Sequence, residues 1–160
     1  MHIPSASCRT LDILDFDTAL SLSGQGDAYD RDRWIYVPDF YTEYRYILGT
    51  RGADPLICIG VNPSTAEPGK LDNTLKSVER IAAGNGYDSF IMFNVYAQRA
   101  TRPDDMDREL NEALHRANMD AFRYILSLQY GHDASLPSNC VIVTTLLSLV
   151  TLPILLLLLG

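Results

Sequence analysis

Polar side chains that could bind a ligand follow directly after an apolar run at residues 55–61. They are Asn62, Ser64 and Thr65, which supply one amide and two hydroxyls. An amide both donates and accepts hydrogen bonds, so Asn62 can position a water molecule or read the edge of a ligand. The main-chain amides of Ser64 and Thr65 can in addition face an anion at a loop or helix start. The segment after residue 61 is therefore the first candidate site.

A second apolar run, which begins at residue 89, also ends in polar side chains, and these include arginine. The candidate ligand-binding residues of this segment are Asn94, Tyr96, Arg99 and Thr101. A guanidinium group binds phosphate and carboxylate groups bidentately, so Arg99 indicates an anionic ligand. The alternative is an ion pair between Arg99 and a structural carboxylate, Asp72 or Glu67. We expect Arg102 to lie at the surface.

Asp72 has two interpretations. Its carboxylate can act as a general base, or it can cap the helix predicted to follow it by accepting a hydrogen bond from a free main-chain amide. The cap is the simpler role. No Ser-His-Asp order, metal-ligand spacing or glycine-rich phosphate motif stands out in the chain, so neither a metal nor a cofactor is predicted.

Two strands and a helix must bring these side chains together. Residues 56–61 suit a strand covered on both faces, and Pro63 ends it because proline cannot donate to a ladder. Residues 89–96 predict a second buried strand, and apolar residues at helical spacing from residue 72 predict a helix between the two. A strand–helix–strand unit is normally parallel, and ligands bind beyond the carboxyl ends of such strands. We therefore expect Asn62 and Arg99 on the same rim.

Further segments complete the expected fold. Residues 34–37 and 44–48 are rich in β-formers and predict an antiparallel hairpin. A long helix is predicted from about residue 103 to Gly131, and a third parallel strand from residue 140. The face expected to be buried along the long helix comprises Met106, Leu110, Ala113, Ala117, Ala121, Tyr124 and Leu128. The predicted fold class is α/β, a three-layer sandwich with a mainly parallel sheet and an N-terminal antiparallel hairpin.

Composition limits the classes of partner. The chain has 160 residues, of which 47% are hydrophobic and 21% charged, as in one ordinary globular domain. Its net charge of −7 argues against the extensive basic surface of non-specific DNA-binding proteins. A local basic pocket for a small-molecule or nucleic-acid ligand is compatible with this charge. Nothing in the composition indicates an oligomeric state.

We divide the chain into an irregular N-terminal segment (1–30), a single α/β domain (31–143) and an atypical apolar C-terminal segment (144–160). Residues 140–160 carry no charge and are long enough to span a bilayer. Pro153, several hydroxyl residues and the lack of flanking basic or aromatic residues argue against membrane insertion. The start of the chain lacks the pattern of a signal peptide, and its three cysteines show no disulfide framework. A cytoplasmic location is predicted.

Three segments carry a resemblance to a known family. They are residues 44–48 with Arg51, residues 62–66 (Asn-Pro-Ser-Thr-Ala) with residues 72–75, and residues 94–101 with Pro103. Together they resemble the mostly bacterial and phage family called domain of unknown function 1643, and Asn118 falls where that family has an asparagine in its long helix. The resemblance covers roughly residues 40–143. It implies no activity by itself.

The Gly60-Val-Asn62-Pro63 strand end is also similar to the Gly-x-Asn-Pro segment of uracil-DNA glycosylases. This resemblance implies a uracil-DNA-glycosylase-like fold and a hydrolase that acts on a nucleobase, nucleotide or nucleic acid. Asn62 would hold the water or the base, and Asp72 would assist. The alternative is a non-catalytic binding module for a small anionic ligand at the same rim. Both families have a late His-Pro segment, whereas no histidine follows His132 here.

Overall fold

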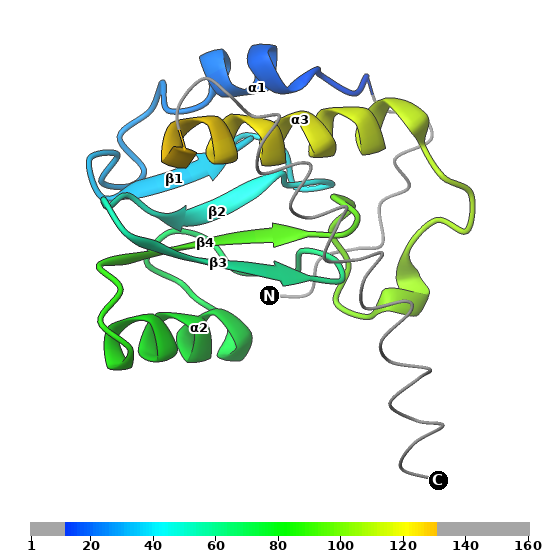
Figure 1. Cartoon of the computed structure of the whole chain (residues 1–160). Coiled ribbons are helices and arrows are strands. Elements are labelled where there is room, and N and C mark those ends of the chain that lie inside the picture. Colours follow the sequence, from blue (N-terminus) through cyan, green and yellow to red (C-terminus); the bar gives the residue numbers. More distant parts are fainter. Residues whose placement is uncertain (1–11, 131–160) are drawn as a thin grey trace, which may run out of the picture. The chain divides into compact units, whose positions relative to one another are not determined.

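An open sheet of four strands forms the centre of the chain (Figure 1). The computed structural model describes residues 12–130. The order of the strands in the sheet is β1-β2-β4-β3. Their bounds are β1 Trp34–Val37, β2 Ile47–Thr50, β3 Pro55–Gly60 and β4 Ser89–Asn94.

The pairing of the strands makes the sheet mixed. β1 and β2 form the predicted antiparallel hairpin, with Trp34 opposite Thr50 and Val37 opposite Ile47. β2 is also antiparallel to β4, and only β3 and β4 are parallel. The prediction of a mainly parallel sheet is therefore wrong. The reason is that the second hairpin strand inserts directly against β4, so that two of the three interfaces are antiparallel.

The strand that precedes the candidate loop lies at an edge of this sheet. Within the described residues β3 pairs with β4 alone, and most of its side chains are only partly buried. Ile59 is 62% exposed. The prediction that this strand is covered on both faces is thus wrong, whereas all six residues of its neighbour β4 are buried. An apolar run indicates a strand but does not distinguish the edge of a sheet from its centre.

The predicted strand–helix–strand unit is present. Helix α2 (Asn73–Gly84) connects β3 to β4, and Leu75, Val78 and Ala82 form its buried face, as their spacing predicts. They belong to one apolar cluster with Phe90 and Met92 of β4. Burying a large apolar side chain in this way contributes about 1.5–3 kcal/mol. Helix α2 thereby packs on one face of the sheet, against the two parallel strands.

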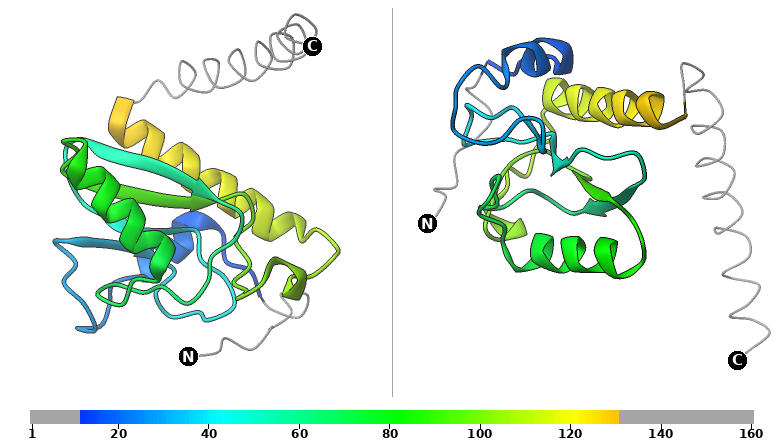
Figure 2. Two further views of the ribbon diagram at one scale, coloured as in Figure 1. Left: turned by 90° about the horizontal axis from the view of Figure 1, so that it is seen from below. Right: turned by 90° about the vertical axis from the view of Figure 1, so that its left-hand side faces the viewer.

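Two helices lie on the opposite face of the sheet from α2 (Figures 1 and 2). No helix was predicted for residues 16–22, which form α1 (Phe16–Leu22), capped by the Asp15 carboxylate on the amide of Thr18 at 2.8 Å. The other is α3 (Glu112–Tyr130). The chain divides into two compact units after Phe122, and the part of α3 before that point belongs to the same unit as the sheet. There Phe122 stacks on Phe93 of β4 with ring centroids 4.1 Å apart.

The predicted start of the long helix is wrong, and its predicted buried face is confirmed only in part. Residues Pro103–Asp105 form only the short 3-10 turn η2, and α3 begins nine residues after Pro103, at Glu112. The Asn111 side chain accepts a hydrogen bond from the Leu114 amide at 3.1 Å, as an N-cap does. This later start places Leu114 and Asn118 on the buried face, together with Ala117 and Ala121 as predicted. Of the other predicted members, Leu110, Ala113 and Leu128 are exposed.

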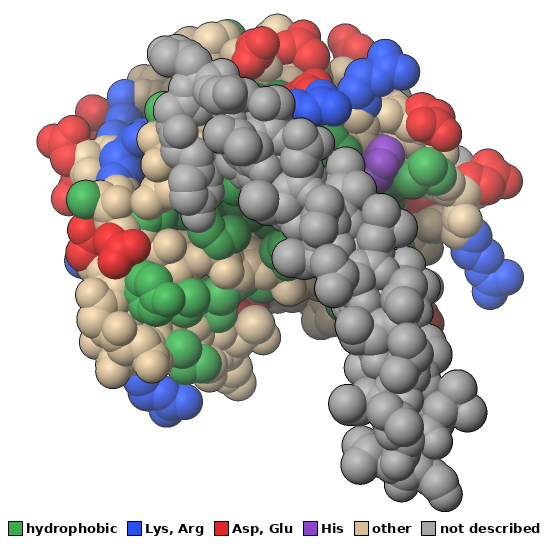
Figure 3. Space-filling view, in the orientation of Figure 1, with side chains coloured by type: hydrophobic (Ala, Val, Ile, Leu, Met, Phe, Trp, Pro, Cys, Tyr) green, Lys and Arg blue, Asp and Glu red, His purple; other side chains and the backbone are tan. Residues whose placement is uncertain are grey.

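Several predictions fall outside the described residues. They concern the third parallel strand from residue 140, the apolar segment 144–160 and the end of the long helix at Gly131. Among residues 12–130, no helix has the length and apolar character needed to cross a membrane. On the face shown in Figure 3, Lys and Arg side chains are scattered among Asp and Glu side chains.

Candidate functional site

The segments that follow β3 and β4 are tied to each other directly. The Asn62 side-chain Nδ2 donates to the main-chain oxygens of Pro63 at 3.0 Å and Ala100 at 2.9 Å. The Ala100 amide donates in return to the Pro63 oxygen at 2.9 Å. Asn62 therefore lies at the junction of the two strand ends, the rim on which the sequence places it. The hydrogen bonds of its side-chain nitrogen therefore link the two loops that follow the strands.

Two buried arginines lie behind the loop that Asn62 begins. Arg45 precedes β2 and Arg99 follows β4, and each is only 2% exposed. Their segments pair with each other beyond the end of the sheet. The Arg45 amide donates to the Ala97 oxygen at 2.9 Å, and the Arg99 amide donates to the Glu43 oxygen at 2.8 Å. This pairing brings two cationic side chains from distant parts of the chain to one place.

Both guanidinium groups donate to the loop between residues 63 and 67. Arg45 Nη1 donates to the Ala66 oxygen at 2.7 Å, and Arg99 Nε donates to the Ser64 oxygen at 2.9 Å. Arg99 Nη1 also donates to the Tyr36 hydroxyl at 3.1 Å. All three acceptors are neutral. In residues 12–130 neither arginine forms an ion pair, so the alternative of an ion pair between Arg99 and Asp72 or Glu67 is not observed. Arg45 Nε is buried without an acceptor among these residues.

The electrostatics of the site disfavour the positive charge of Arg45. Burial, followed by the charge of Arg99, lowers the pKa of the Arg45 guanidinium to about 10. The Tyr36 hydroxyl and the carboxylates of Asp72 and Glu67 act in the opposite direction but do not compensate. Arg45 is still protonated at neutral pH. A buried like-charge pair with neutral partners is costly, and an anion placed nearby lowers that cost.

The loop itself carries unused hydrogen-bond donors. The carbonyls of Ser64 and Ala66 face the arginines. Within the described part of the chain, the amides and hydroxyls of Ser64 and Thr65 donate to no protein group. Both residues are half-buried. Main-chain amides of a turn that lack protein acceptors are the usual components of an anion-binding site.

Asn94 supplies a further unused donor at the end of β4. Its side chain is 1% exposed, and its Nδ2 has no hydrogen-bond partner among the described residues. Met92 is opposite Leu48, which is opposite Tyr36. Because alternate residues of a strand face the same side, Asn94 faces the side of the sheet that carries Met92 and Tyr36. This is also the side on which Tyr36 meets Arg99.

The other predicted site residues have separate positions. The Asp72 Oδ1 accepts from the Leu75 amide at 2.9 Å, which is the predicted cap of α2, and its charge reaches Arg45 only through space. The Tyr96 hydroxyl accepts from the Asn111 amide at 3.0 Å and so positions the start of α3. Thr101 and Arg102 are exposed.

Reasoning from the sequence missed Arg45 and Tyr36 as members of this site. Arg45 stands between Tyr44 and Tyr46, and both tyrosines are fully buried. A single charged residue inside an aromatic strand end is a signal that could have identified it, since a charge is seldom buried without a specific use. Asn118 was noticed only through the family resemblance. Its Nδ2 donates to the main-chain oxygen of Asn94 at 2.9 Å, and this hydrogen bond links α3 to the end of β4.

The fold and site define a mixed α/β domain with a paired-arginine site beyond the carboxyl ends of two parallel strands. A family model described as protein of unknown function (DUF1643) matches residues 45–142, which include both arginines and the loop between the strands. The chain belongs to this family. No curated protein and no solved structure matches the chain significantly.

Proposed function

We propose that the loop after β3 and the two arginines behind it bind a small anionic ligand, such as the phosphate group of a nucleotide. One observation carries this proposal: Arg45 and Arg99 are both buried, yet their hydrogen-bond acceptors are all neutral. Burying charged groups without counter-charge is unfavourable, and proteins that retain such groups commonly use them. An anion would offset the repulsion between them.

The loop gives this ligand a second set of contacts. The arginines hold the carbonyls of Ser64 and Ala66, and the free amides and hydroxyls of Ser64 and Thr65 remain for the ligand. The site thus combines two positive charges with neutral donors, the usual composition of a phosphate site. The proposed ligand is a small molecule or a short nucleic-acid segment, and the proposed setting is the cytoplasm.

The second candidate is a glycosylase-like hydrolase that acts on a nucleobase, nucleotide or nucleic acid, on a three-layer fold of the uracil-DNA-glycosylase kind. It is supported by the geometry of Asn62. The two carbonyls that hold Asn62 Nδ2 also fix the direction of its side-chain oxygen, and a fixed acceptor can orient an attacking water. Asp72 would assist, although its carboxylate already caps α2.

The binding proposal is tested by thermal unfolding in the presence of inorganic phosphate and of uridine monophosphate. A ligand that binds only the folded state raises the unfolding temperature with concentration. We expect this rise for the wild-type protein and for Arg102→Gln, which alters an exposed arginine three residues away. It should be absent in Arg99→Gln. If neither anion raises the unfolding temperature of the wild-type protein, the proposal fails.

The hydrolase candidate is tested by release of free base from uracil-containing DNA and from a panel of modified bases. Release by the wild-type protein that Asn62→Ala abolishes, and that Asn73→Ala at an exposed helix position leaves intact, would support it. An absence of release from every substrate, combined with stabilisation by phosphate, would reject the hydrolase and retain the binding site.

A further inference from the structure

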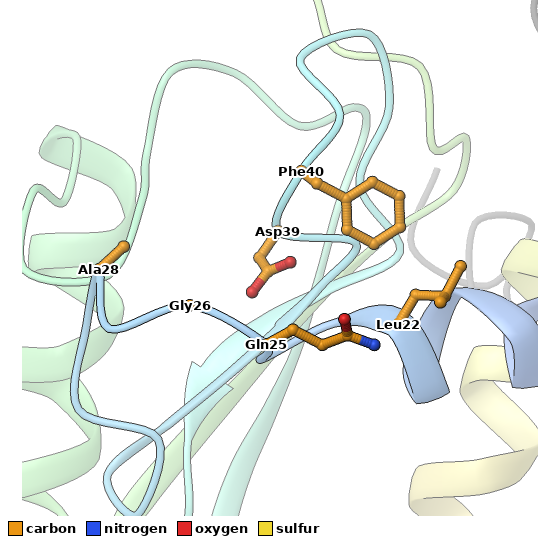
Figure 4. A pocket seen from close by; sticks show the side chains of 6 residues that line it. All are labelled: Leu22, Gln25, Gly26, Ala28, Asp39 and Phe40. Atoms are coloured by element: carbon orange, nitrogen blue, oxygen red, sulfur yellow. The ribbon is translucent and has the colours of Figure 1, made fainter.

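A hollow lies next to the end of α1, and none of the residues that line it belongs to the paired-arginine site (Figure 4). Its volume is about 470 Å³, which is within the range of small-molecule sites, roughly 300–1,000 Å³. Three segments border this open hollow: the last residue of α1, the loop that follows α1 and the turn after β1. The residues that line it are Leu22, Gln25, Gly26, Ala28, Asp39 and Phe40.

A carboxylate in this hollow is held in a fixed orientation. The Asp39 Oδ2 accepts from the Gly24 amide at 2.7 Å and from the Tyr29 hydroxyl at 2.9 Å. Gly24 has φ of 82°, a left-handed conformation that side chains disfavour, and this conformation accompanies the presentation of its amide to Asp39. Burial, and then the hydrogen bond to Asp39, raise the pKa of the Tyr29 phenol, so Tyr29 remains a donor.

The negative charge of this carboxylate is not paired with a cation among the residues that the structure describes. Among residues 12–130 Asp39 forms no ion pair, and its Oδ1 accepts no hydrogen bond. Arg31 packs beside Gly24, but it forms no ion pair with Asp39. A carboxylate that two donors hold in place, with one oxygen unused, is prepared to bind a cation.

Apolar side chains accompany this carboxylate. Leu22 and Phe40 are 42% and 45% exposed, so both offer apolar surface to a ligand. The Phe40 ring packs against Tyr41 with centroids 5.0 Å apart, and Tyr41 stacks on the buried Tyr44 at 4.9 Å. The ring is thus braced by a row of aromatic residues. An aromatic face attracts a cation and also packs against an apolar group.

We propose that this pocket binds a small organic cation, an ammonium group carried on an aromatic or aliphatic body. The ammonium would donate to Asp39 Oδ1, and the body would pack against Leu22 and Phe40. The Gln25 amide, which Figure 4 shows on the same hollow, adds a polar contact. None of these residues contributes to the arginine site, so the two proposals stand independently.

The test uses phenethylammonium as the probe and ¹⁵N NMR titration of the full chain. We expect saturable shifts of amides in residues 22–29 and 39–41. Asp39→Asn keeps an oxygen for Gly24 and Tyr29 but removes the charge, and should weaken binding about tenfold or more. Asp27→Asn is the matched control, since Asp27 is an exposed carboxylate of the same loop that does not line the pocket. It should leave the affinity unchanged.

A neutral probe keeps the test decisive if Asp39→Asn does not fold. 2-Phenylethanol has the same body without the charge and should bind the wild-type protein about tenfold more weakly than phenethylammonium. Equal binding of the two probes would overturn the proposal. So would equal binding of phenethylammonium by Asp39→Asn and the wild-type protein, or the absence of saturable shifts.

Discussion

The two ends of the parallel strands β3 and β4 are built in opposite ways. At the amino end, the Asp88 carboxylate accepts from the amides of Ala53 at 2.8 Å and Asp54 at 3.0 Å, and from the Ser89 hydroxyl at 2.7 Å. An anionic side chain thus satisfies the donors of the loop. At the carboxyl end, cationic side chains donate to loop carbonyls, and the amides of Ser64 and Thr65 donate to no group in residues 12–130.

The folded protein stabilises the charged side chain at one end and disfavours a charged side chain at the other. The hydrogen bonds of Asp88, first from Ser89 and then from Ala53 and Asp54, hold its pKa below the ordinary value of 3.8, so the folded protein favours its charge. The pKa of Arg45 is lowered too, but for a cation this means that the folded protein disfavours its charge. The folded protein thus stabilises the charge at the amino end and disfavours that of Arg45 at the carboxyl end, which is where we propose that an anion binds.

The largest loss of stability is expected for Arg99→Met. It leaves the Ser64 carbonyl and the Tyr36 hydroxyl without their donor. Relief of the repulsion with Arg45 offsets part of this loss, and the net cost is about 2 kcal/mol of the free energy of unfolding. Urea denaturation measures this loss. The control Arg102→Met changes an exposed side chain and should stay within about 0.5 kcal/mol of the wild-type value. Equal stability of the two variants would mean that Arg99 does not hold the loop.

Gly52→Ala should disturb the amino end alone. A Cβ at residue 52 would lie 2.2 Å from Asp88 Oδ1 and 2.3 Å from Ser89 Oγ, so both side chains must move. Overpacking of this kind costs about 1–2 kcal/mol. Gly84→Ala, at a position with open space, should cause no loss. The stabilisation by phosphate should persist in Gly52→Ala, and its disappearance would show that the two ends do not act separately.

Asp88→Asn should remove the pH dependence that the Asp88 carboxylate gives to the free energy of unfolding. Because the folded-state pKa of Asp88 is depressed, its contribution is present above pH 3.8 and is lost as the pH falls through the folded-state value. The variant should thus be less stable than the wild-type protein at pH 7, and the difference should shrink as the pH falls below 3.8. Since Asp88 is exposed, we expect a smaller effect than that of Gly52→Ala. A difference that is constant with pH would contradict this account.

Ser64→Ala should have the smallest effect on stability and a measurable effect on binding. The Ser64 hydroxyl donates to no protein group in the described residues, so its removal should change the free energy of unfolding by less than about 0.5 kcal/mol. Loss of one ligand contact should weaken phosphate binding about fivefold. Calorimetric titration measures this change, with Ser77→Ala on α2 as the control. Unchanged affinity would place the anion away from the loop.

Local patterns in the sequence determined much of this fold. The hairpin of β1 and β2, the unit of β3, α2 and β4, and the cap at Asp72 all follow from side-chain periodicity and from the chemistry of helix ends. These properties depend on residues close together in the chain. The rim shared by Asn62 and Ala100 then follows from the parallel pairing of β3 and β4.

Only the tertiary structure decided the order of the strands, the edge position of β3 and the late start of α3, because each depends on contacts between distant segments. The same holds for the burial of the arginines. Arg45 and Arg99 are 54 positions apart in sequence, and the antiparallel pairing of their segments places both behind one loop. The composition of the chain and the local spacing of its residues do not show that the two arginines come together. Their shared burial, which gives the site its chemistry, arises from pairing between distant strand ends.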